Sequence, residues 1–295
     1  MQIDYASLDR RNLSAEEKVG QAYWLCKLAL FERSGIGAFG RAIVESAEAQ
    51  LEDPVAYMFS SVTQDECRHN SVCKSCINRL CPGFPWRFKA SNEFEEHALR
   101  NVRALYENAH RYWAAYKKAF AKYPIGKIFA SFFFAEVGAQ TIFRMVGEKS
   151  DRDLSAYYDS FRHITFDETR HLEFTVALLR GLAGGMSGEE KLGLTRQMVH
   201  GYIYLSPILA DRPYRDFWEL PVDYFEWDRK LEEKAAEGGL GLPSPEDKLE
   251  GWAKGIQKIL PRLEELGVPI PDIPPLKLKG VHIEVSRDDP IATSF

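Results

Sequence analysis

Two short segments of the chain carry the same five-residue pattern, Asp-Glu-x-Arg-His. One occupies residues 65–69 and the other occupies residues 167–171. On an α-helix, residues three positions apart lie on nearly the same face, so the glutamate and the histidine of each segment point the same way. A carboxylate and an imidazole on one helix face are a suitable pair of ligands for a transition-metal ion.

A single glutamate precedes each segment within an apolar stretch of predicted helix. Glu32 precedes Glu66 by 34 residues, and Glu136 precedes Glu168 by 32 residues. A carboxylate in an apolar stripe must be neutral, paired or metal-bound, because burying it bare is too costly. The sequence therefore contains two copies of one unit, in which a helix with a lone glutamate is followed by a helix with a glutamate and a histidine.

Packing of the two units against each other would bring four glutamates and two histidines to one point. Mixed carboxylate and imidazole ligands favour iron or manganese, whereas zinc sites favour cysteine and histidine. We predict a dinuclear site that holds two iron ions, with manganese at one position as an open alternative. The predicted ligands are Glu32, Glu66, His69, Glu136, Glu168 and His171.

The aspartates and arginines of the two segments have a predicted supporting role. A metal-bound histidine usually donates its other N–H to a carboxylate, which fixes the orientation of the ring. We expect Asp65 and Asp167 each to hold the histidine of the opposite unit, with Arg68 and Arg170 nearby to balance the charge. Ordinary salt bridges at the surface are the alternative.

A third Glu-x-x-His pair is formed by Glu107 and His110. It lacks the flanking aspartate and arginine, and its neighbours include Arg111 and Lys117. We interpret this pair as a chance occurrence on a solvated helix face.

Helix signals dominate the sequence. Residues typical of helix N-termini precede most of the periodic stretches. These residues are Ser14 with Glu17, Asp53 with Pro54, Asn92 with Glu95, Ser150 with Asp153, Ser187 with Glu190, and Ser244 with Pro245. The expected helices cover about residues 15–50, 54–80, 92–122, 127–148, 150–181, a stretch from 187 onward, and 245–265. Only residues 277–285 resemble a strand, so the predicted fold class is all-α, with helices long enough for a bundle.

Composition limits the other possibilities. The 295 residues are 45% apolar with a net charge of -5 and no basic stripe, so we expect a globular protein that does not bind nucleic acid. The polar start lacks the apolar core of a signal peptide, and no apolar run approaches the ~20 residues of a membrane span. Five cysteines without export signals favour free thiols and a cytoplasmic location. The four cysteines within residues 67–81 cannot all face one ion from a straight helix, so we interpret them as small buried side chains.

The six-ligand pattern resembles the ferritin-like di-iron carboxylate superfamily over about residues 14–181. The doubled Asp-Glu-x-Arg-His segment is most similar to the hydroxylase subunits of bacterial multicomponent monooxygenases, and more loosely to ribonucleotide reductase small subunits. The resemblance implies a ferritin-like four-helix bundle over residues 1–185. Additional helices over residues 186–266 would pack on this bundle, and residues 267–295 would form an extended C-terminal arm, either packed or loose. The resemblance also implies that two iron ions react with dioxygen and that a separate reductase or ferredoxin supplies the electrons.

The residues at three positions near the ligands help to distinguish between the protein families that the chain resembles. Cys73 lies four residues after His69, where the reductase small subunits usually carry a radical tyrosine and methane-oxidising relatives carry cysteine. Gln140 lies four residues after the third ligand glutamate, where the hydroxylases often carry a threonine, and Thr141 is the next residue. We therefore name Cys73, Gln140 and Thr141 as the residues expected to line the active-site pocket.

The predicted function is hydroxylation of a small apolar or aromatic molecule by an oxygen-activating di-iron oxygenase. Arylamine N-oxygenation or desaturation is the alternative. The arylamine N-oxygenases carry a seventh histidine ligand at the position of Ile164, and His163 is one residue off. A non-catalytic iron-binding or scaffold protein is the third possibility, while iron-storage chains of this fold are much shorter. The sequence does not determine the oligomeric state, and a homodimer is one possibility.

Overall fold

The computed structural model describes residues 3–48, 53–120, 125–208 and 218–284, and the side chains of these residues other than 112–120 and 125–132. The described part is all-α, as predicted. Its α-helices are α1 (Ala15–Glu48), α2 (Asp53–Leu80), α3 (Glu93–Phe120), α4 (Ile125–Lys149), α5 (Ser155–Ala183), α6 (Gly188–Leu205), α7 (Tyr224–Glu237) and α8 (Pro245–Glu265). The short 3-10 helix η1 (Tyr5–Arg10) precedes α1, and η3 (Pro274–Leu276) follows α8.

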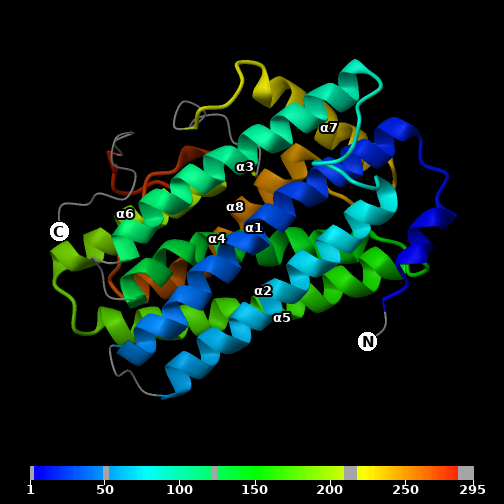
Figure 1. Ribbon diagram of the computed structural model, residues 1–295. Coiled ribbons are helices and arrows are strands. Elements are labelled where there is room, and N and C mark those ends of the chain that lie inside the picture. Colours follow the sequence, from blue (N-terminus) through cyan, green and yellow to red (C-terminus); the bar gives the residue numbers. More distant parts are fainter. Residues whose placement is uncertain (1–2, 49–52, 121–124, 209–217, 285–295) are drawn as a thin grey trace.

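Four long helices form the centre of the molecule (Figure 1). Helix α1 packs along α2, and α4 packs along α5, so each pair corresponds to one of the two repeated sequence units. The two pairs meet where α2 contacts α5 and α1 contacts α4. Helices α2 and α5 run antiparallel, because Asp65 lies beside His171 while His69 lies beside Asp167.

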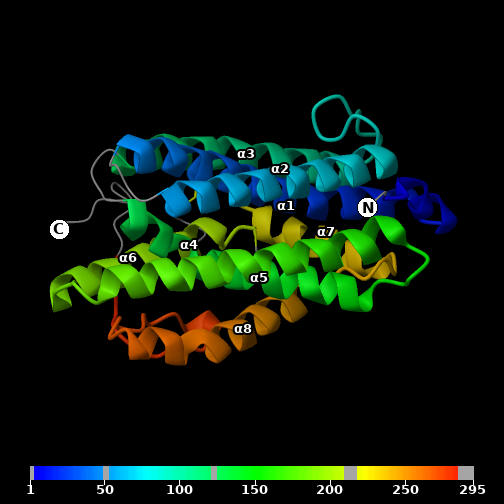
Figure 2. The same ribbon diagram turned by 90° about the horizontal axis from the view of Figure 1, so that it is seen from below.

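The remaining helices cover the outside of this bundle. Helices α3 and α7 pack on α1, whereas α6 and α8 pack on α4. Figure 2 shows α3 and α8 on opposite sides of the molecule. The indole of Trp252 on α8 is buried and donates a 2.8 Å hydrogen bond to the carbonyl oxygen of Phe134 on α4, which fixes α8 against the bundle.

A buried group of charged side chains joins α1 to α7 and α8. The Nζ atom of Lys27 lies 2.6 Å from Asp228 and 2.5 Å from Glu232, and Nζ of Lys248 lies 2.5 Å from Glu232. The hydroxyl of Tyr23 donates a hydrogen bond to Asp228. Since buried charges are stable only when paired, this group links three helices that are distant in sequence.

Several predicted helix starts are confirmed by their capping bonds. The Ser14 hydroxyl accepts from the amide of Glu17, whose carboxylate accepts from the amide of Ser14. The same reciprocal box opens α6 at Ser187, and Ser244 caps α8.

The predicted start of the fifth helix is wrong by several residues. Ser150 donates instead to the carbonyl oxygens of Val146 and Leu240, so it belongs to the end of α4. Helix α5 begins at Ser155, preceded by Leu154.

The predicted strand near the C-terminus is not formed within the described residues. Two isolated bridges, Pro271 with Val281 and Ile273 with Leu278, take its place. Between Ile273 and Leu278 the chain reverses direction through η3 and Lys277, whose φ of 58° is left-handed. The described part of the predicted arm packs on the body, since Leu276 and Leu278 are buried, whereas residues 285–295 lie outside the description. Every helix in the described segments is too short or too polar to cross a membrane.

Candidate metal centre

All six predicted ligands are buried in the middle of the bundle. Helix α1 provides the first glutamate and α4 provides the third, while α2 and α5 each provide a glutamate and a histidine. Their exposed fractions are between 0% and 3%. We call this set the carboxylate–histidine cluster: Glu32, Glu66, His69, Glu136, Glu168 and His171.

The ligand atoms form two overlapping groups. In the first, Nδ1 of His69 lies 3.1 Å from a carboxylate oxygen of Glu32 and 3.1 Å from one of Glu168, and Glu66 completes the group. In the second, Nδ1 of His171 lies 3.4 Å from Glu66 and 3.6 Å from Glu136.

Glu66 belongs to both groups, and within each group the ligand atoms lie within 4.8 Å of one another. Glu168, assigned to the first group, also lies 3.7 Å from His171 Nδ1. Two adjacent groups of buried side chains that could each hold a metal ion therefore share Glu66.

The second nitrogen of each histidine faces an aspartate from the other half of the chain. His69 Nε2 lies 3.1 Å from Asp167, and His171 Nε2 lies 3.2 Å from Asp65. Arg68 lies 2.8 Å from Asp65 and 2.5 Å from Asp167. Arg170 pairs with the same two aspartates. Each aspartate thus holds the histidine of the opposite unit, and the arginines connect both aspartates to the surface.

Burial and mutual repulsion control the charges in the cluster. Burial raises the pKa of Glu66 well above its usual range, and the nearby Glu32 raises it further. Burial also raises the pKa of Glu136 to about 7. Burial also acts to raise the pKa of Glu168, but the charges of His171 and His69 and their hydrogen bonds together outweigh it, and the pKa falls to about 2. The same attraction raises the pKa of His171 although burial opposes it. Without a metal, the four acids therefore retain protons or depend on protonated histidines.

Several polar atoms of the cluster make no hydrogen bond within the described part of the chain. They are Oε1 of Glu32, Oε2 of Glu66, Oε2 of Glu136, both carboxylate oxygens of Glu168, and Nδ1 of His171. Leaving such buried atoms unpaired is costly, unless another group satisfies them. A pair of divalent cations fits this donor set, since oxygen and imidazole ligands suit iron and manganese.

The predicted pocket residues lie in three different surroundings. Cys73 is fully buried, and burial together with the nearby Glu32 raises its pKa, so this thiol lies beside the first group. Gln140 donates a 2.9 Å hydrogen bond to the hydroxyl of Thr169 on α5. Thr141 is buried against Gly255 of α8. Whether any of the three contacts a substrate stays a prediction.

The third Glu-x-x-His pair lies away from these groups. Glu107 and His110 are both exposed on α3. Of the three consecutive phenylalanines before Glu136, Phe133 and Phe134 are fully buried, and the side chain of Phe132 lies outside the description. The buried group around Lys27 was not predicted, although a single lysine within an apolar part of a predicted helix signals a buried partner.

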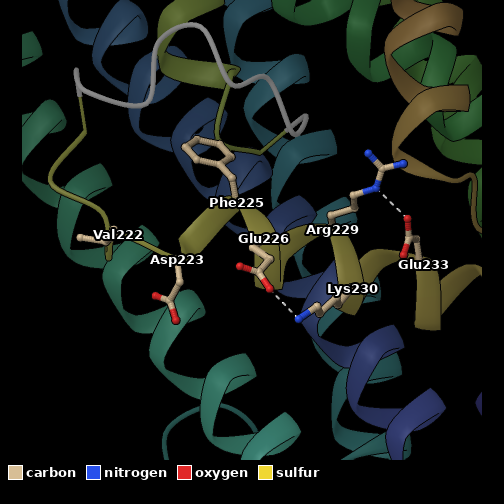
Figure 3. A pocket seen from close by; sticks show the side chains of 7 residues that line it. All are labelled: Val222, Asp223, Phe225, Glu226, Arg229, Lys230 and Glu233. Carbon is tan, nitrogen blue, oxygen red and sulfur yellow. Dashed lines mark hydrogen bonds and ion pairs between the residues drawn. The ribbon is translucent and has the colours of Figure 1, made fainter.

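An open surface pocket of about 520 Å³ lies on α7 and the turn before it (Figure 3). Its charged side chains pair with each other, Arg229 with Glu233 and Lys230 with Glu226. The other lining residues are Val222, Asp223 and Phe225. Because no predicted site residue lines this pocket, we do not assign the chemistry of the cluster to it.

Comparisons with known proteins add no family to this geometry. No family model matches the chain, and neither a curated protein nor a solved structure matches it. The function of the cluster has to be inferred from its own side chains and their arrangement.

Proposed function

We propose that the carboxylate–histidine cluster binds two iron ions and that the chain is an oxygen-dependent oxidoreductase, an oxygenase for a small apolar or aromatic molecule. The observation that carries the proposal is the convergence of four buried glutamates and two histidines whose free oxygen and nitrogen atoms face one another. Four carboxylates neutralise two divalent ions, so the loaded cluster would be uncharged. A buried site is most stable in that condition.

The two groups of ligand atoms suggest how the ions would be held. Glu32, Glu168 and His69 would bind one ion, Glu136 and His171 would bind the other, and Glu66 would serve both. Bound iron would supply the reaction with dioxygen and the oxidising power that protein side chains lack.

The aspartates and arginines would set the state of the histidines. Because Nδ1 of each ring faces the acids, a neutral ring would carry its proton on Nε2 and donate it to Asp65 or Asp167. Burial alone would raise the pKa of Asp167, but His69 and Arg68 outweigh it, so the pKa of this carboxyl lies below its usual value. The aspartates therefore stay ionised and keep each imidazole oriented toward the ions.

The apolar surroundings favour an apolar substrate. The ring of Phe39 lies 6.4 Å from that of His171, and the ring of Phe143 lies 6.4 Å from that of His69, measured between centroids. Both phenylalanines are buried, as is Cys73, so these side chains would help to exclude water from the metal ions and favour an apolar substrate.

The electron balance implies a partner. Insertion of one oxygen atom from dioxygen into a substrate, with reduction of the other atom to water, needs two electrons beyond those of the substrate bond. We propose that a separate reductase or ferredoxin supplies them.

N-oxygenation and desaturation would use the same metal centre. Ile164 is buried and apolar at the position where the arylamine N-oxygenases carry a further histidine, and His163 is exposed. This difference favours oxygenation at carbon. Products formed from an alkane, a phenol and an arylamine by the loaded protein with a chemical reductant distinguish the reactions.

An anaerobic titration with iron(II) tests the metal centre. We expect two ions per chain, followed on mixing with oxygen by a short-lived absorption band and then by oxygen consumption that depends on substrate. The variant His171→Ala should lose at least one ion and the absorption band, whereas the exposed control His110→Ala should retain both. A chain that binds no iron supports the scaffold alternative, and one that accumulates many irons supports storage.

A further inference from the structure

Gly35 of α1 lies directly beside the shared glutamate. A Cβ atom built at this position would lie 2.5 Å from Oε2 of Glu66, 2.7 Å from its Cδ and 3.1 Å from its Cγ. Non-bonded carbon atoms pack at roughly 3.5–4.0 Å, so any side chain at position 35 would occupy space that the carboxylate now fills.

The usual reasons for a glycine do not account for this position. Gly35 lies within α1, where its backbone conformation is not left-handed, and glycine in a helix is less favourable than alanine. At Gly20 of the same helix, the nearest atoms belong to the backbones of Leu231 and Ala235, which is close packing of two helices. At Gly35 the three nearest atoms all belong to the side chain of Glu66.

An added methyl group at position 35 would displace the side chain of Glu66, because the three atoms it meets all belong to that side chain. Its carboxylate is 2% exposed and lies among Glu32, Glu168 and Glu136, the other acids of the cluster. Its Oε2 atom, the one nearest to position 35, makes no hydrogen bond to any residue that the structure describes, so nothing among these residues would keep the carboxylate in its present position. A displaced carboxylate would move out of at least one of the two groups of ligand atoms.

We infer that Gly35 is a positioning residue of the metal centre. The side chain that glycine lacks leaves room for the Glu66 carboxylate, and in this position the carboxylate can be shared by two ions. This inference rests on the proposed two-ion centre and adds a structural requirement to it. The residue acts through Glu66 and does not itself contact an ion.

The test compares two glycines of the same helix. At Gly40 an added Cβ meets no atom within 4 Å, so Gly40→Ala is the matched control for Gly35→Ala. Both variants, and the wild-type full-length chain, are titrated with cobalt(II) under anaerobic conditions. Bound ions per chain, affinity and the visible cobalt spectrum are measured, together with the circular dichroism of each metal-free protein.

Wild type and Gly40→Ala should bind two ions with the same spectrum. Gly35→Ala should bind at least ~10-fold more weakly at one or both positions, as is typical when a group that orients a ligand is changed. Its cobalt spectrum should also differ from that of wild type, because the shared carboxylate is displaced.

A second pair of variants separates positioning from packing. Glu66→Asp retracts the carboxylate by one methylene, so it should weaken binding by itself. The shortened side chain ends one bond before the position of Oε2, the atom nearest to the new methyl group. Adding Gly35→Ala to Glu66→Asp should therefore cost less affinity than adding it to wild type.

The outcomes distinguish the inference from the proposed function. A wild-type chain that binds no cobalt or iron refutes the two-ion centre itself. Binding of two ions by wild type and Gly35→Ala with equal affinity and equal spectra leaves the centre intact and overturns the role of Gly35. If Gly35→Ala does not fold, recovery of folding and binding in the double variant supports the inference, and failure of the double variant to fold contradicts it.

Discussion

The Nε2 atom of His69 lies 3.1 Å from Oδ2 of Asp167, a residue 98 positions further along the chain. The reverse pair, His171 with Asp65, has a separation of 3.2 Å. The two helix pairs therefore exchange carboxylates, and each holds the ring of the other. This exchange couples assembly of the bundle to orientation of the metal-facing nitrogens, because the Nε2 atom of each histidine is paired with an aspartate of the other half.

Replacement of one exchanged carboxylate should weaken metal binding without removing a ligand. Asp167→Asn retains the shape of the side chain but loses the charge that fixes the ring of His69. We expect a loss of roughly 10–100-fold in metal affinity, measured by competition with a chelator. Glu173→Gln, an exposed change on the same helix that touches only the surface pair with Arg262, is the control. Equal affinities of the two variants would contradict the supporting role of Asp167.

The metal-free protein should become less stable as pH rises from about 4.5 to 7. The pKa of Glu136 is raised by burial from 4.5 to about 7, so in this window the folded chain binds a proton that the unfolded chain releases. Burial acts in the same direction on Glu32 and Glu66. One such proton changes the free energy of unfolding by about 1.4 kcal/mol per pH unit, and stability falls because the folded state holds more protons. Thermal unfolding should show a decrease of several degrees.

Addition of a divalent metal should reverse this pH dependence. The ions replace the protons of the cluster, so binding releases protons and strengthens as pH rises. The increase in melting temperature on adding iron(II) or cobalt(II) should therefore be larger at pH 8 than at pH 5.5. A metal-induced increase that is independent of pH would show that the buried acids are not the metal ligands.

The sequence predicts the cluster better than it predicts the surrounding structure. Within each repeated segment the glutamate and the histidine must lie on one helix face, since residues three apart share a face whatever the tertiary packing. The sequence therefore identifies the side chains that point toward the cluster. The cap at Ser14 was also predictable, because both partners of the reciprocal bond lie within four residues. Ser150 shows the limit of such local reasoning, since its hydroxyl bonds to the carbonyl of Leu240 in a distant loop.

Two further features depend on contacts that a single sequence does not contain. The glycine-rich part of α1 indicates missing side chains, but only the position of α2 shows that Gly35 faces Glu66. Similarly, Lys27 requires a buried acid, yet nothing local selects Asp228 and Glu232 from the many acids of the chain.

The five cysteines should differ sharply in reactivity. Cys67 is exposed, whereas Cys26, Cys73, Cys76 and Cys81 are buried. Burial raises the pKa of Cys76 and Cys81 to about 12, so these thiols stay protonated and unreactive near neutral pH. We expect a thiol-specific reagent to modify one cysteine per native chain and all five after denaturation. Cys67→Ser should abolish the native reaction, and rapid modification of a second thiol would contradict the burial of the others.

Loss of Lys27 should destabilise the fold far more than loss of an exposed lysine. Lys27→Met leaves the buried carboxylates of Asp228 and Glu232 with Lys248 as their remaining cation. Removing one partner of a buried ion pair typically costs about 3–5 kcal/mol, because the remaining charge is uncompensated. Lys254→Met is the matched control, since Lys254 pairs with Glu250 on the solvent side of α8 and such pairs contribute about 0–1 kcal/mol. Chemical denaturation measures both free energies, and equal values would mean that the buried group does not hold α7 and α8 on α1.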